Sequence, residues 1–136
     1  MAGWRGSVPR PGMNPDSSPN GFLESFRHAL DGIGAASKGR NFRVQLAAGA
    51  AAVAAGLWLG ISPGEWVAVA LCIGLVLAGE CANTALEASV DLASPARHPL
   101  ARRAKDAAAG AALLLSFTAV AVGAIVFLPR ILVLFR

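Results

Sequence analysis

The chain has 136 residues, a length that bounds it to a single domain. Hydrophobic residues make up 55% of it and the mean hydropathy is +0.56, which excludes an ordinary soluble domain. The net charge of +4 does not require a nucleic-acid partner, because basic residues beside membrane spans and anionic headgroups account for such an excess.

Residues 1–20 form the first segment, and we expect a disordered leader there. The segment contains four prolines and no apolar stretch, so it also differs from a cleavable signal peptide. The remaining residues, 21–136, are expected to form one membrane domain.

An amphipathic helix is predicted over about residues 22–37. Apolar residues recur there at helical spacing with charged residues between them, as in helices that lie on a membrane surface: Phe22, Leu23, Phe26, Leu30 and Ile33. The alternative is a soluble helix packed on a loop.

Three membrane spans are predicted, at about residues 41–61, 65–92 and 100–129. Residues 44–61 and 107–129 carry no charge and approach or exceed the roughly 20 residues needed to cross a bilayer. The middle span holds acidic residues from Glu80 onward, but its apolar pattern continues to Leu92. The fold class expected is therefore an all-α membrane protein with three transmembrane helices after a surface helix.

The basic residues predict the orientation of these spans. Ten of the twelve precede the first span or lie between the second and third: Arg5, Arg10, Arg27, Lys38, Arg40, Arg43, Arg97, Arg102, Arg103 and Lys105. Because cytoplasmic loops are enriched in Lys and Arg, we expect a cytoplasmic N-terminus.

Small residues dominate the first span, where residues 47–56 are almost all alanine or glycine. Such residues let membrane helices pack closely. Three spans enclose little interior, so burying several acids would require more than one copy, and we expect a homo-oligomer.

A polar face is predicted on the second span. Its members fall within about 100° on a helix: Glu80, Asn83, Thr84, Glu87 and Asp91. A carboxylate at membrane depth costs at least ~2.5 kcal/mol, so this face must meet protein, water or a ligand, and a functional site is the default interpretation. The alternative is that these groups pair with one another and only fix helix packing.

Phosphoryl transfer needs a base for the acceptor hydroxyl, a metal held by carboxylates and cations for the ATP oxygens. Glu80, the deeper acid, suits the first task, and Glu87, nearer the interface, suits Mg²⁺. Lys105 and Asp106 open the third span at the same membrane level as Asp91. The sequence contains no Walker A or soluble-kinase motif, so ATP would bind at the membrane surface.

Residues 80–91 read E-x-x-N-T-A-x-E-x-x-V-D, and H-P-L at 98–100 and A-K-D at 104–106 follow. This pattern resembles the prokaryotic diacylglycerol kinase family over roughly residues 22–129. The resemblance implies a homotrimer of three-span subunits with shared active sites, in the inner membrane of a bacterial cell, acting on ATP, Mg²⁺ and a membrane lipid alcohol.

The resemblance also implies roles for individual residues. Glu80 matches the general base and Asn83 a residue that positions the transferred phosphate, while Glu87 matches the carboxylate of the metal and nucleotide. Further nucleotide-binding positions are Arg97, His98, Lys105 and Asp106. The positions that border the opening for the lipid are Asn41, Phe42 and Arg43.

One position departs from the family pattern. Three residues before Phe42 the family carries a glutamate that shares the metal, and this sequence has Gly39. Asp31, water or an ATP oxygen would then have to supply the second ligand, or activity would be lost.

Family members phosphorylate either diacylglycerol or undecaprenol, and residues 41–43 and 95–100 look more like the undecaprenol-kinase branch. Two other functions stay open on sequence grounds. One is a non-catalytic proteolipid in which Glu80 binds a proton or sodium ion. The other is a kinase-like subunit that has lost turnover.

Overall fold

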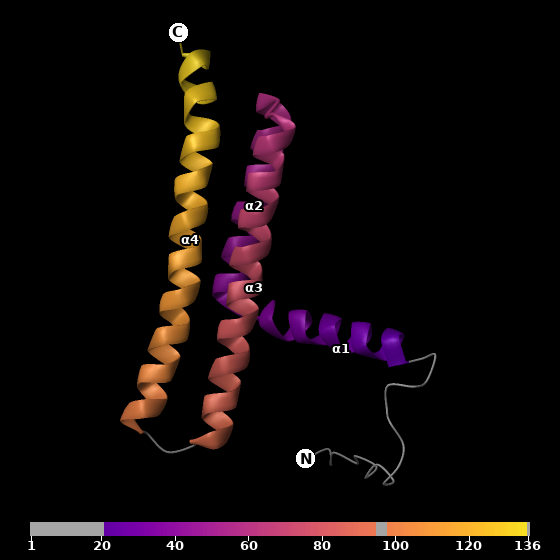
Figure 1. Cartoon of the computed structure of the whole chain (residues 1–136), viewed down its shortest axis with the longest axis vertical. Helices are drawn as coiled ribbons and strands as arrows, with labels where there is room; N and C mark the ends of the chain where they lie inside the picture. The colour runs from indigo at the N-terminus through magenta and orange to yellow at the C-terminus, as the bar shows by residue number, and fades with distance from the viewer. Residues whose placement is uncertain (1–20, 95–97, 136) are drawn as a thin grey trace.

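A computed structural model describes residues 21–94 and 98–135, which form four helices. These are α1 (Gly21–Ala36), α2 (Arg40–Leu59), α3 (Pro63–Ala93) and α4 (Pro99–Leu134). Helices α2, α3 and α4 form a bundle, and α1 lies crosswise to it (Figure 1). The three long helices are long and apolar enough to cross a membrane, which confirms the predicted all-α, three-span architecture. The predicted leader lies outside the described residues.

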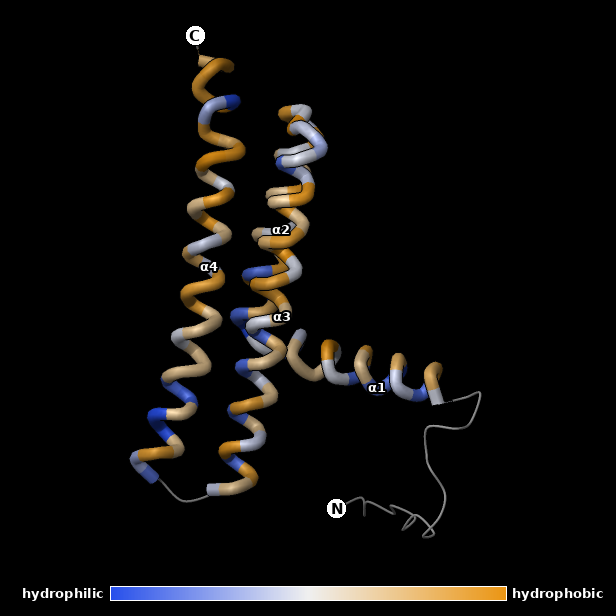
Figure 2. Tube along the Cα trace, viewed as in Figure 1, coloured by the Kyte–Doolittle hydropathy of each residue, from blue (hydrophilic) through white to orange (hydrophobic). Residues whose placement is uncertain are grey.

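Helix α1 is amphipathic, with hydrophobic and hydrophilic residues on opposite sides (Figure 2). Its end contacts the bundle, where Ala36 is buried. Its large apolar side chains are all exposed: Phe22, Leu23, Phe26, Leu30 and Ile33. Protein therefore leaves this face uncovered in the described part of the chain, and its position on a membrane surface stays a prediction.

A tight turn joins α2 to α3. Gly60 ends α2 in the left-handed conformation, with φ of 61°, which glycine adopts without steric cost. Ser62 and Glu65 then form a capping box: the Glu65 Oε2 accepts from the Ser62 N–H at 2.7 Å, and the Ser62 Oγ accepts from the Glu65 N–H at 3.4 Å. The two helices are thus held antiparallel by local hydrogen bonds.

Small residues bring the long helices together. At Gly79 of α3 an added Cβ would collide with Leu115 of α4, the helix with which α3 has its most extensive contact. At Gly56 of α2 it would lie 2.9 Å from Cη2 of Trp66. The close packing predicted for the small residues of the first span is therefore found at Gly56, while Gly79 adds a position on the second span.

Helix α4 continues past the end that the sequence suggests. Its 36 residues run through Pro129 to Leu134 and span about 54 Å, which exceeds the roughly 30 Å of a hydrocarbon core. Beside the proline, Arg130 Nη1 donates to the Val126 carbonyl at 3.1 Å, and its guanidinium pairs with Glu65 of α3 at 2.5 and 2.7 Å. The hydrophilic residues of the bundle gather mostly at its other end, in the halves of α3 and α4 that lead to the connection between these two helices (Figure 2).

Candidate functional site

A groove of about 760 Å³ lies between the three long helices. It opens because α2 and α4 both pack on α3 but contact each other much less. One end is lined by polar side chains, namely Arg40, Asn41, Gln45, Glu80 and Asn83. The rest is lined mainly by apolar side chains and reaches Phe127 of α4. The groove thus changes from polar to apolar along its length.

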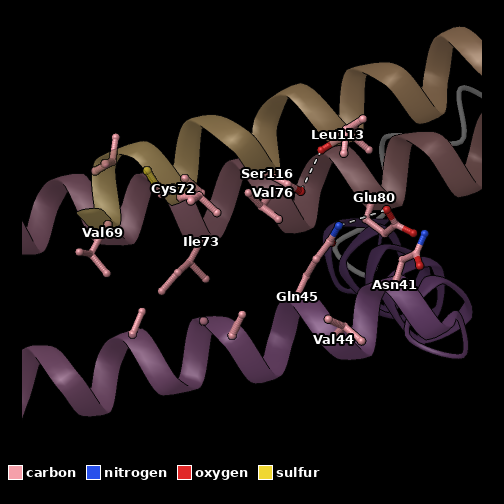
Figure 3. A pocket seen from close by; sticks show the side chains of 18 of the residues that line it. Asn41, Val44, Gln45, Val69, Cys72, Ile73, Val76, Glu80, Leu113 and Ser116 are labelled. Atoms are coloured by element: carbon pink, nitrogen blue, oxygen red, sulfur yellow. Dashed lines mark hydrogen bonds between the residues drawn. The ribbon is translucent and has the colours of Figure 1, made fainter. Parts of the chain in front are cut away.

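Glu80 lies at the polar end and is only 6% exposed. Its Oε2 accepts a hydrogen bond from Nε2 of Gln45 on α2 at 3.4 Å. Figure 3 shows Gln45 and Asn41 reaching from α2 toward this carboxylate. The buried acid is therefore approached by polar side chains of a second helix.

Asn83 and Glu87 follow Glu80 on the same face of α3. Asn83 is 8% exposed, and its Nδ2 donates to Glu87 Oε1 at 3.2 Å. Its Oδ1 is buried and has no hydrogen-bond partner among the described residues. Because buried polar atoms are nearly always hydrogen-bonded, this oxygen is a candidate acceptor or ligand for a bound group.

The residues predicted to bind ATP gather where α3 and α4 approach their connection. Lys105 Nζ lies 2.9 Å from Oδ1 of Asp91 and so joins the two helices. Asp106 faces Arg102 one turn earlier, at 3.6 Å. His98 caps α4, its Nδ1 accepting from the Leu100 N–H at 3.2 Å. Arg97 lies outside the described residues.

Of the three residues predicted to border the lipid, one lines this groove. Asn41 lines the groove, whereas Phe42 is 5% exposed and Arg43 is exposed, and neither lines it. Sequence reasoning missed Gln45. Gln45 could have been recognised from the sequence, because it is the one residue with an amide, hydroxyl or charged side chain in residues 44–61.

The site can supply oxygen ligands for Mg²⁺, but few of them. The described residues contain no cluster of three or more His, Cys, Asp or Glu side chains, and Gly39 contributes none. Glu87 offers a carboxylate and Asn83 an unpartnered amide oxygen. Mg²⁺ in phosphoryl-transfer sites is held by one or two carboxylates together with waters and substrate phosphates, so this donor set fits a metal that arrives with ATP.

A match to one known protein family covers the helices that carry these residues. Residues 27–127 match the family described as prokaryotic diacylglycerol kinase. The chain belongs to this family. It is therefore a multi-pass membrane protein and an ATP-dependent lipid kinase.

Two relatives carry different names. The kinase is 40% identical to an undecaprenol kinase of Bacillus subtilis over 113 residues, which cover 82% of this chain and 92% of the relative. It is 42% identical to a diacylglycerol kinase of Synechocystis over 117 residues, 85% of this chain and 66% of that relative. The family and its lipid kinase activity follow from these matches, while the two names differ in the lipid.

Proposed function

We propose that the kinase transfers the γ-phosphate of ATP to the hydroxyl of a lipid alcohol held in the groove between α2, α3 and α4. The observation that carries this proposal is the buried carboxylate of Glu80 at the polar end of an otherwise apolar groove. An amphiphile matches both properties, since its hydroxyl can reach Glu80 while its chain covers the apolar walls.

Glu80 acts as the general base. The hydroxyl proton passes to a Glu80 oxygen while the alcohol oxygen bonds to the γ-phosphorus. The bond between that phosphorus and the β,γ-bridging oxygen breaks, and ADP leaves. Burial supports this role, because a carboxylate withdrawn from water is not hydrogen-bonded to solvent and is available to the alcohol.

Asn83 and Glu87 are the residues proposed to bind the metal ion that accompanies the ATP phosphates. Glu87, with the Asn83 oxygen beside it, would hold Mg²⁺, which when bound neutralises phosphate oxygens. Lys105, which is bonded to Asp91 of α3, supplies a cation for the phosphates. Further residues proposed to bind the nucleotide are Arg97, His98 and Asp106. Water and ATP oxygens would have to supply the further ligands, because Gly39 offers no carboxylate.

Undecaprenol is the proposed acceptor, in preference to diacylglycerol. The undecaprenol kinase of Bacillus subtilis is matched over 92% of its length, against 66% for the diacylglycerol kinase of Synechocystis. The groove runs from one polar end along apolar walls, which also suits an alcohol with one chain better than a lipid with two.

The proposed setting is a homotrimer in the bacterial inner membrane, with a cytoplasmic N-terminus. Large apolar side chains are exposed on all three long helices of a single copy, which suits contact with lipid and with further copies. The basic residues favour the orientation.

The test uses purified protein in lipid vesicles with Mg-ATP and either undecaprenol or diacylglycerol. We expect phosphorylated undecaprenol as the main product and little product with Glu80→Gln. Absence of lipid phosphate from both alcohols would overturn the proposed function, and a clear preference for diacylglycerol would overturn the assigned acceptor alone.

A further inference from the structure

Gln45 follows the polar start of α2 and is the one residue with an amide, hydroxyl or charged side chain in residues 44–61, and its location suggests why it is there. It lies partly buried on α2 and lines the polar end of the groove. A primary amide at membrane depth loses hydrogen bonds to water, so it requires partners within the protein or a ligand. The partner found is Oε2 of Glu80, across the helix interface at 3.4 Å.

The other end of the same amide is unsatisfied. Gln45 Oε1 is buried and has no hydrogen-bond partner among the described residues. An amide that served only to join α2 to α3 would be expected to use both ends, because leaving a buried carbonyl unpaired is destabilising. The free oxygen therefore points to a second state in which it is used.

Proton transfer creates such a state. An ionised carboxylate only accepts hydrogen bonds, whereas a protonated carboxyl also donates one. A glutamine amide can meet both forms, since its nitrogen donates to the carboxylate and, after rotation of the amide, its oxygen accepts from the protonated acid. Glutamine is thus suited to remain bonded to a base that gains and loses a proton in each turnover.

We propose that Gln45 is the positioning residue for Glu80, holding this carboxyl group in place through both of its protonation states. Before transfer, the Gln45 amide fixes Oε2 and leaves Oε1 of Glu80 to face the alcohol. After transfer, the Gln45 carbonyl accepts from the protonated acid. This inference rests on the proposed role of Glu80 as base.

The test compares variants of the full chain in lipid vesicles, with Mg-ATP and whichever of undecaprenol and diacylglycerol the parent phosphorylates. Gln45→Met keeps the length of the side chain but removes its donor and acceptor. We expect kcat to fall at least about tenfold, with the KM for ATP and for lipid changed less than about twofold, because an interaction with the base is made during transfer. Leu46→Met, one residue along α2 and exposed, is the matched control and should retain parental kcat.

A conservative replacement separates positioning from packing. Gln45→His supplies one donor and one acceptor in the neutral imidazole, and kcat should stay within about threefold of the parent. Parental kcat in Gln45→Met would overturn the inference, as would an equal loss in both variants. If Gln45→Met does not fold, Gln45→Asn takes its place with the same expectation, since it keeps the amide but shortens the reach.

A double variant distinguishes failure of this inference from failure of the proposed function. If Glu80→Gln is slow and Gln45→Met is not, only the role of Gln45 fails. If Glu80→Gln keeps parental kcat, the assignment of the base fails as well. When both single variants are slow, adding Gln45→Met to Glu80→Gln should lower the residual rate less than about twofold, because the residues act as a unit. A full multiplication of the two losses would overturn the coupling.

Discussion

Lys105 of α4 directs its ammonium group at Asp91 of α3, with Nζ 2.9 Å from Oδ1 and 3.2 Å from Oδ2. The cation proposed for ATP therefore has a carboxylate partner within the protein. If Lys105 binds ATP as proposed, a phosphate must compete with Asp91 for it, which would lower the affinity for the nucleotide.

Asp91→Asn should strengthen ATP binding. The substitution removes the competing negative charge and leaves Lys105 available to phosphate. The side chains are 36% and 66% exposed, and exposed ion pairs are worth up to about 1 kcal/mol, so the KM for ATP should fall by at most about fivefold. Steady-state kinetics with varied Mg-ATP measures this. A raised KM would instead mean that Asp91 holds Lys105 in its working position.

Glu80→Gln should lower kcat by about 10²–10⁴-fold, the usual contribution of a general base. The replacement has nearly the same shape but accepts no proton, so the KM for ATP should change little. The matched control is Glu24→Gln on exposed α1, which removes a charge outside the site. Equal activity of the two variants would exclude Glu80 as the base.

Gly79→Val should destabilise the bundle by about 1–3 kcal/mol, the typical cost of overpacking. The new side chain would collide with Cδ1 of Leu115 and crowd Cα of Ala112, which lies 4.0 Å from the added Cβ. Gly74→Val on the same helix has open space and serves as control. Thermal unfolding in detergent should show a lower midpoint for the first variant only, and equal midpoints would disprove close packing at Gly79.

Gly39→Glu should strengthen metal binding if the family's usual ligand position keeps its geometry in this chain. We expect the dissociation constant of Mn²⁺, measured by electron paramagnetic resonance with a non-hydrolysable ATP analogue, to fall about tenfold, because each added carboxylate raises cation affinity. The new Cβ would lie 3.1 Å from the Ala36 carbonyl, so the turn between α1 and α2 must shift by a few tenths of an ångström.

The control for this variant is Gly34→Glu, which adds the same charge on α1 where there is open space. If both variants strengthen Mn²⁺ binding equally, the gain comes from net charge alone and Gly39 is not a ligand position.

The helices could be predicted because long uncharged runs and amphipathic spacing are local properties of the sequence. The end of α4 could not, because Pro129 usually breaks a helix, and here the helix continues beside an Arg130 that is bonded to Val126 and to Glu65. The ion pair joins residues 65 positions apart, and no local pattern reveals such a contact.

The polar face of α3 was predictable from the sequence, whereas the side chains that approach it from other helices were not. The spacing of Glu80, Asn83 and Glu87 defines one face of one helix, whatever surrounds it. By contrast, Asn41, Phe42 and Arg43 are consecutive and differ by about 100° in direction, so they cannot all face one groove. Gln45 follows Asn41 by four positions and shares its face, which is the pattern that would have found it.

The pairing of Arg130 with Glu65 has a consequence for the electrical behaviour of the protein. Glu65 lies in the first turn of α3 and Arg130 near the end of α4, so the two charges lie at the same end of the bundle and cancel each other. A single charge carried across a membrane gains or loses about 2.3 kcal/mol per 100 mV of potential. A neutral pair feels no such net force, so changes in membrane voltage should exert no net pull on Glu65 and Arg130 together.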